Sequence, residues 1–555
     1  MILGLIMTKN LCIISGGTAT NELVSLFSSI SSKITYVLPI SDNGGSTSEL
    51  IRVIGGPAIG DIRSRLTRLI PDNHENLRQL LSYRLSSDST LAKVQWNEIV
   101  DGTHQIWKSI DSPTKEIIRS FLIHLHTELL KRSKFQFNSN PNSNSNRQFR
   151  FELANVGNLF LTGLRLFIGS LDSAIELFIK LTGIDSNISV LPCINTNFSY
   201  HISALLENDL IITGQSQISH PSDNLLDNYP PPIDNTRPPS PLHLEKIQSN
   251  QNEINHHHSN PDLSTNLNQI ILNHQPNLNR LNLGDNEIDL LQQNDDIDMN
   301  PILNSSNLSD IPTSNRTSPI IPLNRVAISQ LNHKQSNKSL LYSKEDSDDE
   351  ETGNIPQYIH PELKKSQLHF NKTNIQPLLS PIKRIFYISP YGEEICPIAH
   401  SRVTTSISNS DAIIYSIGSL MTSIIPVIIL RGIGRAIAND LDANNERKLK
   451  KKILLLNGCT DRETFGMSAT DFIRVIFDLA IYSLKKSKYS ENRINQLKWN
   501  NIITHLIYMK NSKIQVDIEY LASMGINCVE VDKVENEDYY ELKSLEMNLR
   551  NILEN

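Results

Sequence analysis

Two short segments near the start of the chain carry glycine pairs directly after apolar, strand-like runs. In "LCIISGGTAT" the run ends in Gly16 and Gly17, and in "VLPISDNGGSTSEL" it ends in Gly44 and Gly45. Glycine lets the backbone approach phosphate oxygens closely, and a helix that follows points its free N–H groups at the anion. A pair could form only a tight turn, but a strand before and a helix after both pairs favour a phosphate or nucleotide site. The residues predicted to bind it are Gly16, Gly17, Thr18, Asn43, Gly44, Gly45 and Ser46.

A carboxylate, Asp42, lies just before the second glycine pair. It could hold a divalent cation such as Mg2+ against a diphosphate, or orient a hydroxyl nucleophile. It could equally cap a turn or the following helix, a role that Asp often has. Spacing alone leaves these alternatives open, so Asp42 is the candidate catalytic residue and the candidate metal ligand, with Mg2+ as the expected cofactor.

Two later segments also place polar residues after an apolar run. In "YSIGSLMTSIIP" the hydroxyls and backbone amides could bind phosphate or ribose. In "NGCTDRETFGMSATDF" the side chain of Arg462 could pair with a phosphate or remain a solvated loop residue, and Ser468 with Asp471 is expected to cap the next helix. The candidate binding residues of the earlier segment are Gly418, Ser419, Thr422 and Ser423.

These polar loops need a scaffold that brings them together. From Leu11 to Leu69, apolar runs without period-two alternation are interleaved with helical stretches, which is typical of a parallel sheet covered on both faces. In such a doubly wound, Rossmann-like α/β sheet, ligands bind beyond the carboxyl ends of the strands. We expect the later apolar runs, from "RIFYIS" to "INCVEVD", to add strands to the same mostly parallel sheet.

Composition divides the chain into three stretches. Residues 8–215 are the predicted first part of the α/β domain, with a helical excursion at 73–133, and residues 381–555 are its second part. Between them, residues 216–380 are rich in Asn, Ser, Pro and acidic residues, and such a stretch cannot bury enough apolar surface to offset the entropy of ordering it. It is predicted to be a disordered, low-complexity insertion.

Before the insertion, the segment "HISALLENDLIITGQ" predicts a hairpin that turns at Asn208 and Asp209. His201 begins this hairpin, and we expect it at the surface, where histidine is common.

Charge and cysteine usage exclude several classes of protein. The net charge is −7, and Asp and Glu are spread along the sequence, so we expect no nucleic-acid partner. The five cysteines lie far apart with no paired spacing, which argues against a disulfide framework or a zinc knuckle and favours a reducing, cytoplasmic location. No apolar run approaches the roughly 20 residues that span a bilayer, so a membrane is not an expected partner.

The ordered set of motifs resembles the CofD-like family, which includes 2-phospho-L-lactate transferases and bacterial gluconeogenesis factors that bind nucleotide sugars. The resemblance covers Leu11 to about Asp471 without the insertion. It is carried by "SGGTAT", "SDNGGSTSEL", "GDIRSRL", "NVGNLFLTG", "VLPC", "GSLMTSIIP" and "DRETFGMSATDF" in the family's order. It implies a Rossmann-like fold and a transferase that moves a phospho-carboxylate type group from a nucleoside diphosphate to a hydroxyl. The alternative is a non-catalytic nucleotide or nucleotide-sugar-binding regulator of carbon metabolism, and "GDIRSRL" looks closer to that branch.

The resemblance also implies roles for particular residues. It puts Asp42 at the acidic spot near the acceptor or metal, and it adds Asn155, Gly157 and Asn158 to the pocket lining. Two departures weaken the inferred catalysis more than the inferred binding: Asn43 stands where the family commonly has a second acidic residue, and Ser416-Ile417 stands where relatives have Gly-Pro. The expected partners are a nucleotide or nucleotide-sugar ligand and, in a homodimer, a second copy of the chain.

Overall fold

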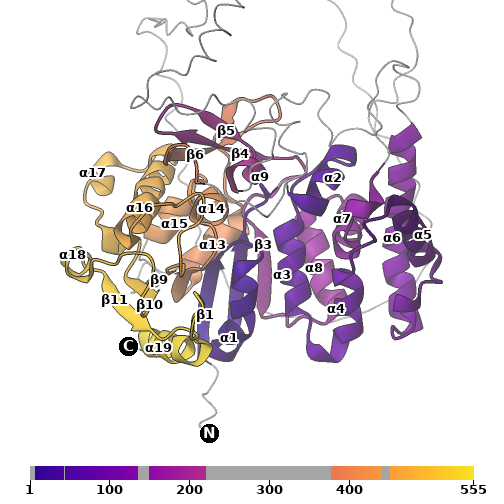
Figure 1. Ribbon diagram of the computed structural model, residues 1–555, viewed down its shortest axis with the longest axis horizontal. Helices are drawn as coiled ribbons and strands as arrows, with labels where there is room; N and C mark the ends of the chain where they lie inside the picture. The colour runs from indigo at the N-terminus through magenta and orange to yellow at the C-terminus, as the bar shows by residue number, and fades with distance from the viewer. Residues whose placement is uncertain (1–6, 43, 135–148, 220–376, 439–449, 555) are drawn as a thin grey trace, which may run out of the picture. The chain divides into compact units, whose positions relative to one another are not determined.

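A seven-stranded parallel sheet forms the centre of the fold (Figure 1). The computed structural model describes residues 7–42, 44–134, 149–219, 377–438 and 450–554. The strands of the sheet, in spatial order, are β11 (Asn527–Val531), β10 (His505–Met509), β9 (Lys451–Leu455), β8 (Ala412–Tyr415), β1 (Met7–Ile14), β2 (Ser31–Leu38) and β3 (Ile188–Pro192).

The strand order contains a switch point between β1 and β8, which pair in parallel with Leu11 opposite Ala412. From β1 the chain builds the sheet in one direction through β2 and β3, and from β8 it builds in the opposite direction through β9, β10 and β11. Because parallel crossovers are right-handed, these two directions put the connecting helices on opposite faces. The predicted doubly wound α/β fold is therefore confirmed.

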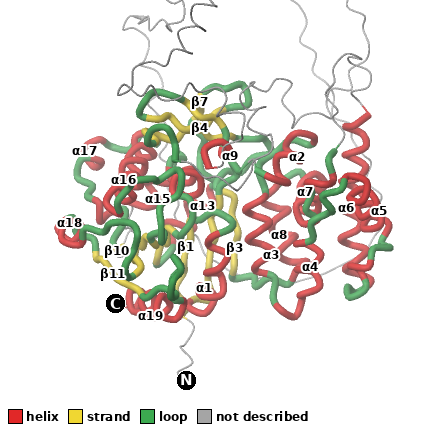
Figure 2. The backbone as a smooth tube through the Cα atoms, in the orientation of Figure 1, coloured by secondary structure: helices red, strands yellow, loops and turns green. Residues whose placement is uncertain are grey.

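Helices flank the sheet, as the red tubes around the yellow strands of Figure 2 make visible. A π-helical turn, Leu420–Ile424, follows β8 and leads into α14. The α-helices are α1 (Val24–Ile30), α2 (Gly45–Val53), α3 (Gly60–Leu69), α4 (Glu75–Ser82), α5 (Ser89–Asp101), α6 (Ser112–Lys134), α7 (Val156–Ile168), α8 (Leu171–Thr182), α9 (Gln215–Ser219), α13 (Ser401–Asn409), α14 (Ile425–Ile428), α15 (Ile433–Ala438), α16 (Ala469–Lys486), α17 (Glu491–Ile494), α18 (Ile518–Ser523) and α19 (Leu542–Glu554).

A second, antiparallel sheet lies at the upper end of the view in Figure 1. Its strands are β5 (Ile211–Thr213), β4 (His201–Leu206), β6 (Ile382–Ile388) and β7 (Glu394–Ile395), in that order. The predicted hairpin is confirmed, and Asp209 takes a positive φ of 63° in its turn. The prediction that "RIFYIS" extends the parallel sheet was wrong, because this segment is β6 and pairs with β4.

The position of His201 also differs from the prediction. The residue is 3% exposed in β4, where it pairs with Ile388 of β6. Burial lowers the pKa of its imidazole to about 4, so the side chain is neutral at physiological pH. Its Nδ1 atom has no hydrogen-bond partner. The expected surface position was wrong because the sequence did not reveal that β6 covers this strand.

The long polar stretch begins later than its composition indicates. The prediction placed the insertion at 216–380, but Ser216 to Ser219 belong to α9, and Ser216 and Gln217 are buried. The described chain resumes at residue 377, and residues 220–376 of the predicted insertion lie outside the described residues. The division of the chain into domains therefore stays a prediction.

None of the five cysteines forms a disulfide. Among the residues that the structure describes, no helix combines the length and the apolar character needed to cross a bilayer.

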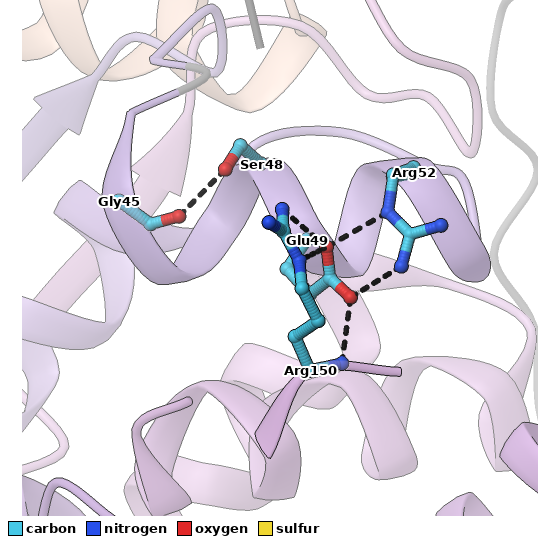
Figure 3. Close-up of polar contacts among 5 residues, drawn as sticks. All are labelled: Gly45, Ser48, Glu49, Arg52 and Arg150. Carbon is cyan, nitrogen blue, oxygen red and sulfur yellow. Dashed lines mark hydrogen bonds and ion pairs between the residues drawn. The ribbon is translucent and has the colours of Figure 1, made fainter. Parts of the chain in front are cut away.

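A buried carboxylate, Glu49, ties α2 to the chain that follows α6 (Figure 3). Its side chain is inaccessible to solvent and accepts hydrogen bonds from the Arg52 guanidinium at 2.5 and 2.8 Å. The backbone N–H of Arg150 donates to it at 2.7 Å, and the Arg150 guanidinium pairs with it at 3.2 Å. Burial by itself raises the pKa of Glu49, but the two arginines outweigh burial and hold this pKa below its ordinary value of 4.5.

We expect Glu49→Gln to lower the free energy of unfolding by about 3 kcal/mol at pH 7. This is the lower end of the range for breaking a buried ion pair, chosen because both guanidiniums reach solvent. A lowered pKa means that the carboxylate stabilises the fold above pH 4.5 and loses this effect as the pH falls through its folded-state pKa. Chemical denaturation should therefore show the two proteins converging in stability below pH 4.5.

The matched control is Lys383→Gln, which removes an exposed ion pair with Asp209. It should change stability by less than about 1 kcal/mol. A Glu49→Gln protein as stable as this control at pH 7 would contradict the assigned role of Glu49.

Candidate functional site

A cavity of about 510 Å³ opens where β2, β1, β8 and β9 end, at the switch point of the sheet. Each of these four neighbouring strands is followed by a loop that reaches the cavity wall, and α9 contributes to the wall as well. Open α/β sheets bind their ligands at this position. The lining residues are Gly16, Gly17, Thr18 and Ala19 after β1; Asp42, Gly44, Gly45, Ser46 and Thr47 after β2; Gly60, Asp61, Arg63, Ser64, Arg84 and Asn158; Gln215, Ser216 and Ser219 of α9; Ile417, Gly418, Ser419, Thr422 and Ser423 after β8; and Asp461, Arg462 and Glu463 after β9.

The first glycine pair is required by contact between loops. A Cβ on Gly17 would lie 2.3 Å from Oδ1 and 2.7 Å from Cα of Asp61, at the start of α3. A Cβ on Gly16 would lie 2.5 Å from Oγ of Ser423, in the loop after β8. Side chains at these two positions would push apart the segments that surround the cavity, so glycine here allows the loops to pack together.

Two other glycines face open space. Gly45 has φ +54° and no atom within 4 Å of a built Cβ, and Gly418 has φ +134° with only Ala19 nearby, at 3.8 Å. Positive φ at both positions favours glycine for conformational reasons. At Gly45 the backbone therefore faces open space in the cavity wall, whereas the N–H and carbonyl of Gly418 bond to the Asn457 side chain at 3.0 and 2.7 Å.

The N-terminus of α2 lies at the cavity and has the features of an anion site. Gly44 precedes the helix in an extended conformation, and no side chain among the described residues caps the helix. The first-turn residues Gly45, Ser46 and Thr47 line the cavity. The N–H groups at the start of a helix generally lack an intrahelical partner, although that of Thr47 donates to the Gly44 carbonyl at 3.3 Å. Asp42 accepts a hydrogen bond from the Gly44 N–H at 3.0 Å, so it forms the predicted turn and also lines the cavity.

Asp61 is a second carboxylate in the same wall, on the first turn of α3. Burial and then the charge of Asp42 raise its pKa, and the Gly17 N–H and the charges of Arg65 and Arg63 offset this only in part. The pKa rises from an ordinary value of 3.8 to about 7, so Asp61 can exchange a proton near neutral pH. Within the described chain, no cluster of three or more His, Cys, Asp or Glu side chains is arranged to hold a metal ion.

Glu463, in the loop after β9, lies at the centre of a cluster of hydroxyl groups in the cavity wall. Its carboxylate accepts hydrogen bonds from Ser219 at 2.5 Å, from Thr422 at 2.9 Å, and from Ser419. Burial and the nearby Asp461 raise its pKa to about 7 despite these three donors. The cluster joins α9 to the loops after β8 and β9.

Arg65 holds the first loop from beneath. It is fully buried, and its Nη2 donates to the Gly16 carbonyl at 3.0 Å while the guanidinium stacks on Tyr36 at 4.7 Å from the ring centre. Burial lowers the pKa of Arg65 to about 10, so it remains charged at neutral pH. The Gly16 carbonyl is therefore directed toward this buried guanidinium.

Most of the predicted site residues meet at this cavity. Asn43 lies outside the described residues. Asn155 and Gly157 do not line the cavity: Asn155 caps α7 by accepting hydrogen bonds from the N–H groups of Gly157 and Asn158. The predicted residues that line the cavity are Gly16, Gly17, Thr18, Asp42, Gly44, Gly45, Ser46, Asn158, Gly418, Ser419, Thr422 and Ser423, with Arg462 beside them.

Sequence reasoning missed several lining residues, above all Asp61, Arg63 and Arg84. Asp61 and Arg63 belong to "GDIRSRL", where a glycine precedes an acidic residue in the first turn of a helix, and that spacing was a usable signal. Ser219 was missed because it lies within a polar stretch whose composition resembles the segment after it. Arg84 carried no signal, because a loop arginine after a helix is common.

Comparisons with known proteins agree on one family. The family model described as 2-phospho-L-lactate transferase CofD matches residues 11–534. An uncharacterized protein of Saccharomyces cerevisiae is 40% identical over 542 residues, which cover 95% of this chain and 97% of the relative.

Shorter matches join the chain to bacterial proteins named as gluconeogenesis factors. The protein from Yersinia pestis is 34% identical over 79 residues, and the one from Thermotoga maritima is 35% identical over 77 residues. These alignments cover 14% of this chain and 25% and 24% of the relatives. A crystal structure of protein BH3568 from Bacillus halodurans aligns with a TM-score of 0.47 at 14% identity, over 98% of this chain and 99% of the other.

Double-mutant cycles should separate the two close contacts of the first loop. Gly16→Ala meets only the side chain of Ser423, so Ser423→Gly should recover most of a loss of about 1–3 kcal/mol in unfolding free energy. The Cβ that Gly17→Ala adds would also meet the Cα of Asp61, which Asp61→Gly does not remove. Asp61→Gly should therefore recover little of the unfolding free energy that Gly17→Ala loses. Equal recovery in both cycles, measured by chemical denaturation, would contradict this packing.

Asp61→Asn should stabilise the folded protein at pH 8. A raised pKa means that the folded state holds this proton more tightly than the unfolded state, so ionisation costs stability as the pH rises from about 4 to about 7. Each pKa unit corresponds to about 1.4 kcal/mol, which water in the cavity reduces, so we expect a gain of about 2 kcal/mol.

The gain from Asp61→Asn should be complete above about pH 7 and small near pH 4 in thermal unfolding. The control Asp209→Asn changes an exposed carboxylate in a hairpin turn and should give no pH-dependent gain. An Asp61→Asn protein less stable than the parent at pH 8 would show that burial of the ionised Asp61 does not destabilise the fold.

Proposed function

The chain belongs to the CofD family, and from this premise we propose that it is a transferase acting on a nucleoside diphosphate. The diphosphate carries a phospho-carboxylate type group, and a hydroxyl acceptor receives it. The observation that carries the proposal is the convergence of three glycine-containing loops with Asp42 and Asp61 in one cavity. No single loop would be specific, but their combination suits a ligand with several anionic oxygens.

The backbone amides of the cavity suit the diphosphate. The N-terminus of α2 contributes N–H groups and the positive end of the helix dipole. The hydroxyls of Ser419 and Thr422 line the same cavity and can bind further oxygens of the phosphate or ribose. These groups bind and orient the ligand without adding charge.

Asp42 and Asp61 fit a magnesium ion. The charge of Asp42 raises the pKa of Asp61, so a cation between them would relieve a repulsion that the fold otherwise keeps. Mg2+ usually takes one or two protein carboxylates and completes its shell with phosphate oxygens and water. When bound, it would neutralise the charge that develops on the departing phosphate.

The reaction would exchange one phosphorus–oxygen bond for another. The acceptor hydroxyl oxygen forms a bond to the phosphorus distal to the nucleoside, and the bond from that phosphorus to the bridging oxygen breaks. The nucleoside monophosphate leaves with the bridging oxygen and its electron pair. Whichever of the Asp42 and Asp61 carboxylates the cation leaves free is suited to orient the hydroxyl and to take its proton.

A non-catalytic regulator that binds a nucleotide or nucleotide sugar is the second candidate. Asn43 favours it, because an amide replaces a second carboxylate beside Asp42 and removes one charge that a cation or base could use. The short matches to proteins named as gluconeogenesis factors point the same way. Both candidates use the same cavity and differ in their need for metal.

Thermal unfolding of the full chain with nucleoside diphosphates, with and without Mg2+, tests the proposal. We expect stabilisation that requires Mg2+ and reaches about 2.7 kcal/mol at 100 times the dissociation constant. Asp42→Asn should remove the magnesium dependence, while Asp209→Asn, far from the cavity wall, should preserve it.

Binding of a nucleotide sugar to the same degree with and without Mg2+, and unchanged by Asp42→Asn, would favour the regulator. The absence of stabilisation by any nucleotide would contradict both candidates.

A further inference from the structure

Two arginines, Arg63 and Arg84, line the cavity without a carboxylate partner. Arg63 projects from the first turn of α3 and is half-buried, and Arg84 follows α4 and is exposed. Among the described residues neither guanidinium forms an ion pair with Asp or Glu, although Asp42 and Asp61 line the same cavity. Arg52, which is also half-buried, differs in that it pairs with Glu49.

The first turn of α7 packs against the side chain of Arg63. The Nε of Arg63 donates to Oδ1 of Asn158 at 2.9 Å, which fixes the plane of the guanidinium. A Cβ on Gly157 would lie 2.9 Å from Cδ of Arg63 and 2.2 Å from the Leu81 carbonyl, so glycine makes room for the arginine stem. The resemblance had assigned Gly157 to the pocket itself, and its contact instead supports a residue of the pocket wall.

The same turn also places Arg84. Its backbone forms an antiparallel bridge with Asn155, and the flanking bonds join Leu85 N–H to Ala154 at 3.1 Å and Val156 N–H to Tyr83 at 2.9 Å. The segment "NVGN" therefore positions both arginines, one through side chains and one through backbone. One short segment thus holds the guanidinium of Arg63 and the backbone of Arg84.

The positive charges of the two guanidiniums repel each other. Arg63 and Arg84 line the same cavity, and the positive charge of Arg84 acts on that of Arg63. An anion between them would relieve the repulsion and would meet a planar fork of N–H donors that matches the oxygens of a carboxylate or phosphate.

We propose that Arg63 and Arg84 form a second anion subsite, which binds a carboxylate or phosphate group on the part of the ligand distal to the nucleoside. This subsite is separate from the glycine loops, which bind the diphosphate, and the inference rests on the proposed function. It assigns the selection of the transferred or appended group to Arg63 of α3 and to Arg84 in the segment after α4. The nucleotide itself is left to the loops after β1, β2 and β8.

Two matched ligand pairs test the subsite on the full chain with Mg2+ present. A nucleoside diphosphate hexose is compared with its uronic acid, which adds a carboxylate, and a nucleoside diphosphate is compared with the triphosphate, which adds a phosphate. We expect the extra anion of at least one pair to tighten binding about tenfold, as a charge-assisted hydrogen bond does. The pair that gains identifies the group.

Arg84→Gln and Arg63→Gln should each abolish this gain while changing the affinity for the plain diphosphate by less than about twofold. Arg84→Lys keeps the charge without the planar fork and should retain part of the gain. The control is Arg68→Gln, which removes an exposed arginine from the same helix, outside the cavity, and should leave the gain intact. Thermal unfolding of each free variant verifies that it is folded.

The outcomes separate this inference from the proposed function. Diphosphate binding without any gain from an added anion, or a gain that survives in both Arg84→Gln and Arg63→Gln, overturns the subsite and leaves the proposed function standing. No nucleotide binding by the parent protein overturns the proposed function and the subsite together. A gain lost in both variants and kept in Arg68→Gln supports the subsite.

Discussion

The contact between the Gly17 backbone and the Asp61 carboxyl group is the constraint on which the site depends. It brings the loop after β1 against the start of α3 at a distance that only glycine allows. Gly60, next to Asp61, makes a similar approach to Thr47 of α2, and Gly16 does so to Ser423. Four segments are thus joined around one cavity, and the burial that results is the main cause of the raised pKa of Asp61. The same close packing therefore determines both how the loops surround the cavity and how far the pKa of Asp61 is raised.

The chain contains two kinds of buried carboxylate with opposite consequences. Glu49 is matched by two arginines, has a lowered pKa and holds α2 in place. Asp61 and Glu463 lie in the cavity wall, have raised pKa values and cost stability at neutral pH. The fold thus stabilises α2, whose N-terminus lies at the cavity, while the carboxylates of the cavity wall keep raised pKa values. Perturbed pKa values of this kind are typical of functional sites.

Local pattern and glycine position were enough to predict the α/β class, the loop residues of the first, second and third segments and the hairpin at Asp209. They could not assign β6 to the antiparallel sheet, because a short apolar run does not say which neighbour it pairs with. They also missed Arg84, whose position is set by a backbone bridge to Asn155 far along the chain. Residues whose role is set by a distant partner have no local signature.

The pairing of β1 with β8 joins strands about 400 positions apart, as the bond from the Asn10 N–H to Asp411 reflects. The loops after β1 and β2 belong to the N-terminal part of the sequence, and the loops after β8 and β9 belong to the C-terminal part. A nascent chain that has left the ribosome only through α9 carries most of the lining residues but lacks those after β8 and β9, including Glu463, to which Ser219 donates. Closing so long a loop is slow, so ligand binding is a late property of biogenesis, acquired only after the last strands of the sheet are synthesised.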